Sequence, residues 1–448
     1  MTIIELYDST PINNIIGALT FAPEKIVYVG GFSKKQFASK KQPILEKYLL
    51  QKQLAHTVIE YVQVRKDDLH DIIDKLEKVY TENTDCRFNI EVTGGDDLML
   101  VAIGVLCQRH PEIELFQISS KLRNIKSFSL RDVNERDKSA VEFSNTVEDN
   151  LILHGSCILS ADGCDCLGEK GWDIDEEFTA QINIMWDICC RGIPERFKTV
   201  PFKVHSYPNM WNKVTSVLMA LDGITAQRDN SNIIQISEKD YIEAANQYVD
   251  VNIVDSYLEY LMYRNLLMMY SENGFVFIEF ENDRIRNCFT KSGNILELKT
   301  HILLRKLLED YHADVRTGVT IDWDGDIPDE NQPMIDDANT INEVDIIASV
   351  GITPYFISCK NGRFTSDELY KLDTVAERFG TGYAKKIIVT TDIQYALNDH
   401  EEVILQRAAD MGIVIMDNVH QMTDEEFADQ LIRVLELPKM KERMLQVL

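Results

Sequence analysis

A carboxylate and an ammonium group in the C-terminal third of this 448-residue chain, Asp345 and Lys360, are of the types that metal-dependent phosphodiester hydrolysis uses. They stand on two short strand-like runs joined by residues 350–353. If the chain turns between Ile352 and Thr353, both residues are equally far from the tip and lie directly opposite each other. The carboxylate would then bind Mg²⁺ or Mn²⁺, and the ammonium would offset charge on the scissile phosphate. The spacing therefore predicts a cation site on a small hairpin.

Neighbouring polar residues extend this predicted site. Alternation places Glu343 on the face of Asp345, and Ser358 on the face of Lys360. Glu297 lies on the preceding helical pattern, from where it can reach the same cation. A surface Asp–Lys cross-strand pair, which contributes a few tenths of a kcal/mol, is the alternative. The helical glutamate and the helix that follows the hairpin favour the cation site.

The elements that must position these residues fall into three regions. Strand and helix patterns alternate over residues 1–130, which predicts a mostly parallel sheet with helices on both faces. Residues 131–290 carry apolar helical patterns and then a hairpin pattern, 275–280 with 285–289, which together favour a winged-helix-like connector. Residues 291–448 return to an α/β pattern. The predicted strands cover residues 3–7, 25–30, 57–64, 88–92, 112–118, 386–390 and 413–416, and the predicted helices 13–19, 35–54, 69–80, 97–108, 179–190, 210–221, 240–247, 254–270, 295–311, 367–378 and 401–411.

Two turns in the first region have the composition of a ligand-binding edge. Residues 8–11 (DSTP) follow the first predicted strand, and residues 93–96 (TGGD) follow the fourth. Ligands of parallel sheets bind outside the carboxyl ends of the strands. Gly94 and Gly95 let backbone N–H groups approach a ligand closely, and the helix that follows favours phosphate at its N-terminus. A plain strand-to-helix connection would use the same residues, and Asp96 is expected to cap the helix.

Composition and charge narrow the functional classes. The apolar content of 45% and charged content of 27% are those of a soluble globular protein. A formal charge of −27 argues against a broadly basic nucleic-acid-binding surface, so any nucleic-acid contact must use a local basic patch or metal ions. The nine cysteines lack zinc-finger spacing and indicate a reducing compartment. With neither a signal sequence nor a long apolar stretch, the expectation is a cytoplasmic protein without a membrane anchor.

The C-terminal motifs resemble a known nuclease core. Gly293 and Glu297, the run 343–345 (EVD) and the run 356–362 (FISCKNG) look like the PD-(D/E)xK restriction-endonuclease-like core, and the run 368–372 (ELYKL) strengthens the match. Together they resemble the CARF-domain effectors, the cyclic-oligoadenylate-activated nucleases of type III CRISPR defence. On this resemblance Asp345 is the core acid, Lys360 the motif lysine and Glu297 the helical acid. Ser358 departs from the pattern, which has an acid at that position.

The two N-terminal turns are similar to those of the CARF sensor, a Rossmann-like domain whose homodimer cradles a cyclic oligoadenylate. The resemblance implies a sensor domain at 1–130, a connector at 131–290 and a nuclease domain at 291–448. It also implies cyclic tetra-adenylate as allosteric activator. The implied ligand contacts are Ser9, Thr10, Asn13, Thr93, Gly94 and Gly95, with Asp96 as a weaker candidate.

The resulting hypothesis is a homodimeric nuclease that cleaves DNA, RNA or both once its messenger binds. Glu297 and Asp345 would hold Mn²⁺ or Mg²⁺, and Lys360 would orient the attacking water. One alternative is a ligand-responsive nucleic-acid-binding regulator whose nuclease fold is degenerate. Another is a restriction or repair endonuclease that is active without any messenger. A cleavage assay with and without the messenger distinguishes the three.

Overall fold

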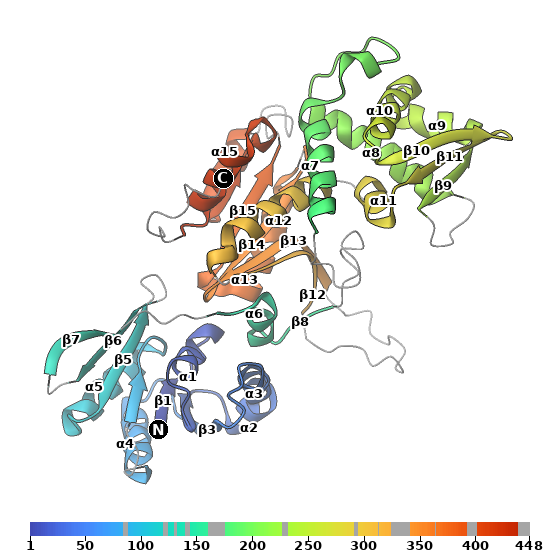
Figure 1. Ribbon diagram of the computed structural model, residues 1–448. Coiled ribbons are helices and arrows are strands. Elements are labelled where there is room, and N and C mark those ends of the chain that lie inside the picture. Colours follow the sequence, from blue (N-terminus) through green and yellow to red (C-terminus); the bar gives the residue numbers. More distant parts are fainter. Residues whose placement is uncertain are drawn as a thin grey trace, which may run out of the picture.

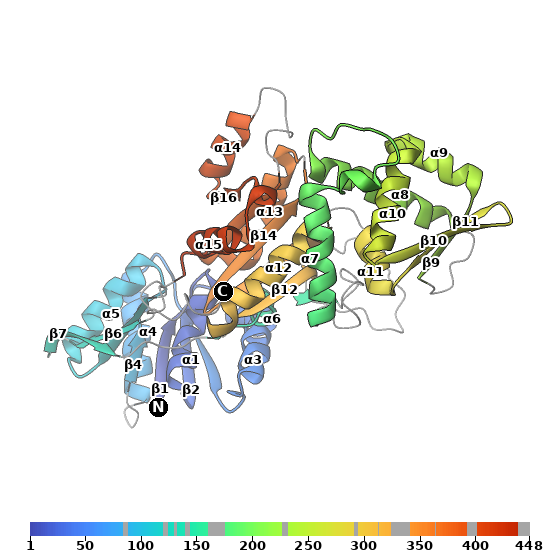
Figure 2. The ribbon, with the colours of Figure 1, turned by 45° about the horizontal axis from the view of Figure 1, so that its top comes forward.

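The computed structural model places three units in a row, in the same order in Figures 1 and 2. The C-terminal unit (residues 144–159 and 294–437) lies between the N-terminal unit (1–138) and the middle unit (175–290). No helix within the described residues is long and apolar enough to cross a membrane. The structure describes residues 1–83, 88–119, 124–129, 132–138, 144–159, 175–225, 232–290, 294–311, 313–323, 341–362, 364–391 and 401–437.

The N-terminal unit is built on a seven-stranded sheet of order β3-β2-β1-β4-β5-β6-β7. Strands β1 to β5 are parallel, as predicted, while β6 and β7 add antiparallel strands at one edge. The sheet continues to Lys138, beyond the boundary expected at residue 130. The strands are β1 (Thr2–Leu6), β2 (Lys25–Gly30), β3 (Val58–Gln63), β4 (Phe88–Glu91), β5 (Glu114–Ser119), β6 (Asn124–Ser129) and β7 (Asp132–Lys138).

Helices cover both faces of this sheet, because successive apolar residues of a strand point to opposite sides. Ile4 packs in the cluster that α4 and α5 contribute to, and Ile3 packs in the cluster on the other face, with α1 and α3. Strand order reverses between β1 and β4, which makes their carboxyl ends the expected ligand crevice. The helices are η1 (Pro11–Asn14), α1 (Ile16–Phe21), α2 (Lys34–Gln36), the π-helical turn η2 (Phe37–Lys41), α3 (Gln42–Gln51), α4 (Leu69–Glu82) and α5 (Asp97–Arg109).

The middle unit differs from the prediction in its hairpin. The expected pairing of residues 275–280 with 285–289 is wrong, because the second run lies in helix α11, whose start is capped by Asn282 through a bond from the Ile285 N–H. Strand β11 instead pairs with β10 around Asn273 and Gly274, whose φ values of 52° and 79° suit a tight hairpin turn. The elements are α7 (Glu176–Arg191), η4 (Glu195–Phe197), α8 (Tyr207–Ile224), β9 (Ile233–Ser237), α9 (Glu238–Tyr248), α10 (Val251–Tyr263), β10 (Leu267–Glu272), β11 (Phe275–Phe280) and α11 (Asp283–Thr290).

The C-terminal unit has a six-stranded sheet of order β16-β15-β14-β13-β12-β8. Strands β12, β13 and β14 are antiparallel neighbours, and β14, β15 and β16 are parallel. The elements are α6 (Val147–Leu153), β8 (Cys157–Ile158), α12 (Asn294–Leu308), η5 (Glu309–Tyr311), β12 (Asp314–Asp322), β13 (Ile341–Val350), β14 (Thr353–Lys360), α13 (Ser366–Gly380), η6 (Thr381–Tyr383), β15 (Lys385–Thr390), α14 (Glu401–Asp410), β16 (Ile413–Met416), η7 (Val419–Gln421) and α15 (Asp424–Val434).

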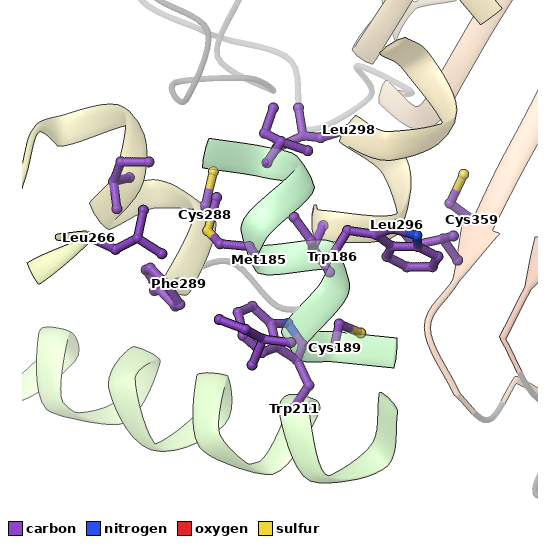
Figure 3. Packing of buried hydrophobic residues seen from close by; sticks show 14 of the residues in the cluster. Met185, Trp186, Cys189, Trp211, Leu266, Cys288, Phe289, Leu296, Leu298 and Cys359 are labelled. Atoms are coloured by element: carbon purple, nitrogen blue, oxygen red, sulfur yellow. The ribbon is translucent and has the colours of Figure 1, made fainter. Parts of the chain in front are cut away.

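Buried contacts join the units to one another. Helix α7 of the middle unit packs on α12, where Trp186, Leu296 and Cys359 share one apolar cluster (Figure 3). At the opposite end of the C-terminal sheet, the β13–β14 hairpin ends in Gly351 and Ile352. Ile352 is buried in the cluster of the N-terminal unit that contains Ile3. The hairpin therefore spans from the N-terminal unit towards the middle unit.

Candidate active site and ligand-binding edge

The β13–β14 hairpin turns one residue earlier than the sequence suggested. Its register pairs Val350 with Thr353 and continues regularly to Ile346 with Ile357. Gly351, with φ of 63°, takes the left-handed position of this two-residue turn. The prediction that Asp345 lies directly opposite Lys360 is therefore wrong.

Asp345 and Lys360 nevertheless come together at the open end of the hairpin. By extension of the register Asp345 faces Ser358, whose hydroxyl lies 3.1 Å from the Asp345 Oδ2 atom. The same oxygen accepts a bond of 2.6 Å from the Cys359 N–H and lies 3.5 Å from the Lys360 ammonium. Three donors thus converge on one carboxylate oxygen, which leaves Oδ1 as the atom that a cation would approach.

In β13 the regular alternation of side chains between the two faces of the sheet is interrupted at Asp345, which the alternation argument did not predict. Val344 packs in the cluster beneath α13, whereas Ile346 packs in the cluster that includes α12. By extension of the register Asp345 faces Gly318 on β12, whose φ of 58° lies in the left-handed region that glycine adopts readily. Because of this kink, the Asp345 side chain can meet groups from both faces of the sheet.

Glu297 reaches the same place from the first turn of α12. The Thr317 hydroxyl donates to the Glu297 carboxylate and lies 3.2 Å from the Asp345 carbonyl oxygen. Burial raises the pKa of the Cys359 thiol, and the charges of Asp345 and Glu297 raise this pKa further. Both carboxylates therefore lie near the buried Cys359. Gly293, the first residue of the quoted motif, is outside the described residues.

Glu368 is a member of this site to which sequence reasoning assigned no role. It lies in the first turn of α13, and its Oε2 atom is 3.1 Å from the Lys360 ammonium. Burial alone would lower the pKa of Lys360, but the charges of Asp345 and Glu368 outweigh it, so the pKa is raised. The sequence could have indicated Glu368 by its position, because an acidic residue in the first turn of the helix after β14 faces the end of that strand.

The residues present fit a hard divalent cation. Mg²⁺ is usually bound through one or two carboxylates and keeps several waters, and Glu297 and Asp345 supply two such groups. No cluster of three or more His, Cys, Asp or Glu side chains placed to hold a metal occurs in the part of the chain that the structure describes. An ion held by these two carboxylates would therefore need its remaining oxygen ligands from outside the protein side chains.

A second candidate site lies at the carboxyl ends of β1 and β4. Asp8 ties the two predicted turns together, because its Oδ1 accepts from the Thr10 N–H at 2.7 Å and its Oδ2 from the Gly95 N–H at 2.9 Å. A Cβ atom on Gly94 would stand 3.0 Å from the Cβ of Asp8 and 3.3 Å from that of Asn13. Ser9 beside them is exposed. The structure thus brings the residues of both turns to one edge.

Two residues of this edge, Thr93 and Asp96, have hydrogen-bond or ion-pair partners that the sequence did not predict. The Thr93 hydroxyl accepts a hydrogen bond of 2.9 Å from the Ile118 N–H on β5, so it also stabilises the sheet. Asp96 stands at the N-cap of α5 but makes no capping bond with its side chain. It pairs instead with Lys66, at 2.6 Å, so the predicted capping role is wrong. Lys66 brings a positive charge to the edge that sequence reasoning did not identify.

Two acidic residues are buried just beneath the edge. Glu5 and Glu91 are neighbours in the β1–β4 register, and neither is exposed. Burial raises the pKa of Glu91 to about 7, although the N–H of Thr93 donates to its carboxylate at 2.7 Å. Burial and the charge of Glu91 also raise the pKa of Glu5. The turn at Thr93 therefore lies directly above two buried carboxyl groups whose pKa values are raised.

The fold of the whole chain is similar to that of solved structures that it matches over nearly its full length. One is protein VC1899 from Vibrio cholerae, with a TM-score of 0.68 and 15% identity over 97% of this chain and 98% of that one. Another is Can2 from Sulfobacillus thermosulfidooxidans in complex with cyclic tetra-adenylate, with a TM-score of 0.62 and 14% identity over 97% and 99%. At such identities the likeness establishes the fold. The sequence itself matches no protein-family model and no curated protein.

Proposed function

We propose that this protein is a metal-dependent nuclease that a cyclic oligoadenylate, in the first instance cyclic tetra-adenylate, switches on in antiviral CRISPR defence. The C-terminal unit would be the PD-(D/E)xK nuclease, the N-terminal unit the CARF sensor, and the molecule a cytoplasmic homodimer. The observation that carries the proposal is the meeting of Glu297, Asp345, Lys360 and Glu368 around one strand end. The whole-length likeness to a protein solved with cyclic tetra-adenylate supports the sensor role.

The chemistry of the site follows from its charges. A bound Mn²⁺ or Mg²⁺ would polarise the phosphate and lower the pKa of a water ligand. Glu297 and Asp345 would hold that ion from the helix and the strand. Lys360, charged because two carboxylates flank it, would orient the water and offset the charge that develops on the phosphate. Ser358 replaces the usual third acid and holds Asp345 in place by its hydroxyl.

The ligand edge fits an oligoadenylate for a separate reason. The first N–H groups of α5, which begins two residues after Gly95, can meet phosphate oxygens, and no side chain at Gly94 blocks the approach of a ligand. The proposed ligand contacts are Ser9, Thr10, Asn13, Thr93, Gly94 and Gly95, with Asp96 held by Lys66. The messenger can raise activity only by binding the active arrangement more tightly than the resting one.

A second candidate function comes from the middle unit. Its order of α8, β9, α9, α10, β10 and β11, with β11 between β9 and β10, supports the proposal that this unit is winged-helix-like. Such a unit could hold DNA, as a ligand-responsive regulator would. Helix α10, in the position of a recognition helix, carries Asp255 and the exposed Glu259. These acids oppose phosphate binding, so the nuclease function is the better supported of the two.

One assay tests both candidates. Plasmid, single-stranded DNA and RNA are incubated with the protein and Mn²⁺, with and without cyclic tetra-adenylate, and again with EDTA. The nuclease proposal expects cleavage that requires both the metal and the messenger. Cleavage at equal rates without the messenger would indicate a constitutive enzyme. Nucleic-acid binding without cleavage would favour the regulator.

A further inference from the structure

One hydrogen bond joins the C-terminal unit directly to the proposed ligand edge. The Tyr383 hydroxyl donates to the Asn13 Oδ1 atom at 2.9 Å, across 370 positions of sequence. Tyr383 is the last residue of η6, just before β15, and it packs against the apolar cluster of the N-terminal unit. A residue of the proposed nuclease unit therefore contacts a residue of the proposed sensor site.

The bond determines what Asn13 offers a ligand. A side-chain amide has one carbonyl acceptor and an NH₂ group with two donors. With the carbonyl oxygen turned to Tyr383, the NH₂ group is the part that remains for a phosphate oxygen or an adenine nitrogen. Asn13 is only 8% exposed and lies against Gly94, so its orientation is fixed by its surroundings.

We propose that Tyr383 is a positioning residue of the messenger site: it orients the Asn13 amide, so that the C-terminal unit helps to form the site that the N-terminal unit carries. This rests on the proposed function, because it takes the ligand to be a cyclic oligoadenylate. It goes beyond that function by assigning part of the messenger affinity to a residue outside the sensor domain.

The position of Tyr383 just before β15 connects this hydrogen bond to Lys360. Strand β15 begins two residues after it and pairs with β14 over six residue pairs, ending at Lys360 with Thr390. Just beyond, Thr391 donates its N–H to the Lys360 carbonyl at 3.3 Å, and its hydroxyl lies 3.0 Å from the Asn361 side-chain oxygen. Strand β15 thus begins beside the ligand edge and ends beside Lys360 of β14, the proposed catalytic lysine.

The test compares binding of cyclic tetra-adenylate, by isothermal titration calorimetry, to four full-length proteins: wild type, Tyr383→Phe, Asn13→Ala and the double variant. Tyr370→Phe, an exposed tyrosine on α13, is the matched control. Loss of one neutral hydrogen bond predicts about fivefold weaker binding for Tyr383→Phe. The double variant is expected to bind like Asn13→Ala, because Tyr383 acts only through Asn13.

A cleavage readout distinguishes positioning from a general structural role. Tyr383→Phe should raise the half-activating messenger concentration about fivefold, in line with the affinity, and leave the rate at saturating messenger unchanged. Unchanged affinity in Tyr383→Phe, or additive losses of affinity in the double variant, would overturn this inference and leave the proposed function standing. Failure of the wild-type protein to bind cyclic tetra-adenylate would overturn the proposed function and this inference together. If Asn13→Ala has a lowered unfolding temperature, Asn13→Asp takes its place. This variant keeps an oxygen acceptor for Tyr383, and we expect it to bind cyclic tetra-adenylate more weakly than Asn13→Ala because its charge repels the phosphates.

Discussion

The Lys360 ammonium is held by Glu368, whose Oε2 atom lies 3.1 Å away on helix α13. This contact is shorter than the 3.5 Å that separates the ammonium from Asp345. Lys360 is therefore placed between two carboxylates from different elements, one on β13 and one on α13. The lysine keeps its charge because each carboxylate opposes the effect of burial.

Replacing Glu368 with Gln should make the activity more sensitive to alkaline pH. The charge of Glu368 raises the pKa of Lys360, so its removal lowers that pKa and brings loss of the proton closer to the working range. We expect the alkaline limb of the rate profile to move to lower pH, while the acidic limb stays in place. Messenger-activated cleavage measured from pH 6 to pH 10 checks this. A profile identical to wild type would show that Glu368 does not tune the lysine.

Asp345→Ala and Lys360→Ala should each abolish cleavage and leave binding of cyclic tetra-adenylate intact. The first removes a proposed metal ligand, and the second removes the charge proposed to offset the phosphate, an effect of about 10²- to 10³-fold in rate for comparable groups. Lys371→Ala is the matched control, because Lys371 also pairs with Glu368 but is largely exposed. Retained activity in either variant, with the control unaffected, would refute the site assignment.

Asn212→Ala should slow cleavage although Asn212 belongs to the middle unit. Its side chain forms a reciprocal pair with Asn361, the residue after Lys360: it donates to the Asn361 carbonyl and accepts from the Asn361 amide at 2.8 Å. Losing these bonds frees the chain that follows Lys360, the proposed catalytic lysine, and we expect about a tenfold lower rate. Single-turnover cleavage is compared with that of Lys213→Ala, an exposed neighbour on α8. Equal rates would show that α8 does not position the site.

Glu91→Gln should flatten the pH dependence of stability between pH 4.5 and pH 7. The pKa of Glu91 is raised by burial from 4.5 to about 7, so the folded state binds more protons than the unfolded state in this range. The wild-type contribution is complete below pH 4.5 and is lost as the pH rises to 7, by about 3 kcal/mol at 1.36 kcal/mol per unit.

Urea unfolding of Glu91→Gln at pH 5 and pH 8 measures this difference. Glu114→Gln, an exposed glutamate on β5, serves as the reference. The Glu91 variant should lose less stability than wild type between the two pH values. An equal loss in all three proteins would mean that Glu91 is ionised in the folded protein throughout this range.

Local patterns predicted the parallel sheet and the strand or helix on which Asp345, Lys360 and Glu297 lie, because strand alternation and helical spacing are local properties. The hairpin register escaped prediction since it depends on which residue takes the left-handed position, and Gly351 decides that. Glu368 was missed as a site residue because its contact with Lys360 depends on how α13 packs on β14. Asp96 has the right position for a cap, but a long-range partner, Lys66, competes for it.

The buried tip of the β13–β14 hairpin has a consequence for how the molecule can be divided. Ile352 completes the apolar interior of the N-terminal unit, and the Gly351 carbonyl accepts from the Asn145 N–H at 3.0 Å. A fragment that starts after this unit would expose Ile352 to water and leave a cavity in the part removed. Joining a different N-terminal unit to this C-terminal unit would therefore require the hairpin tip to be redesigned as well, because the two units share one apolar interior.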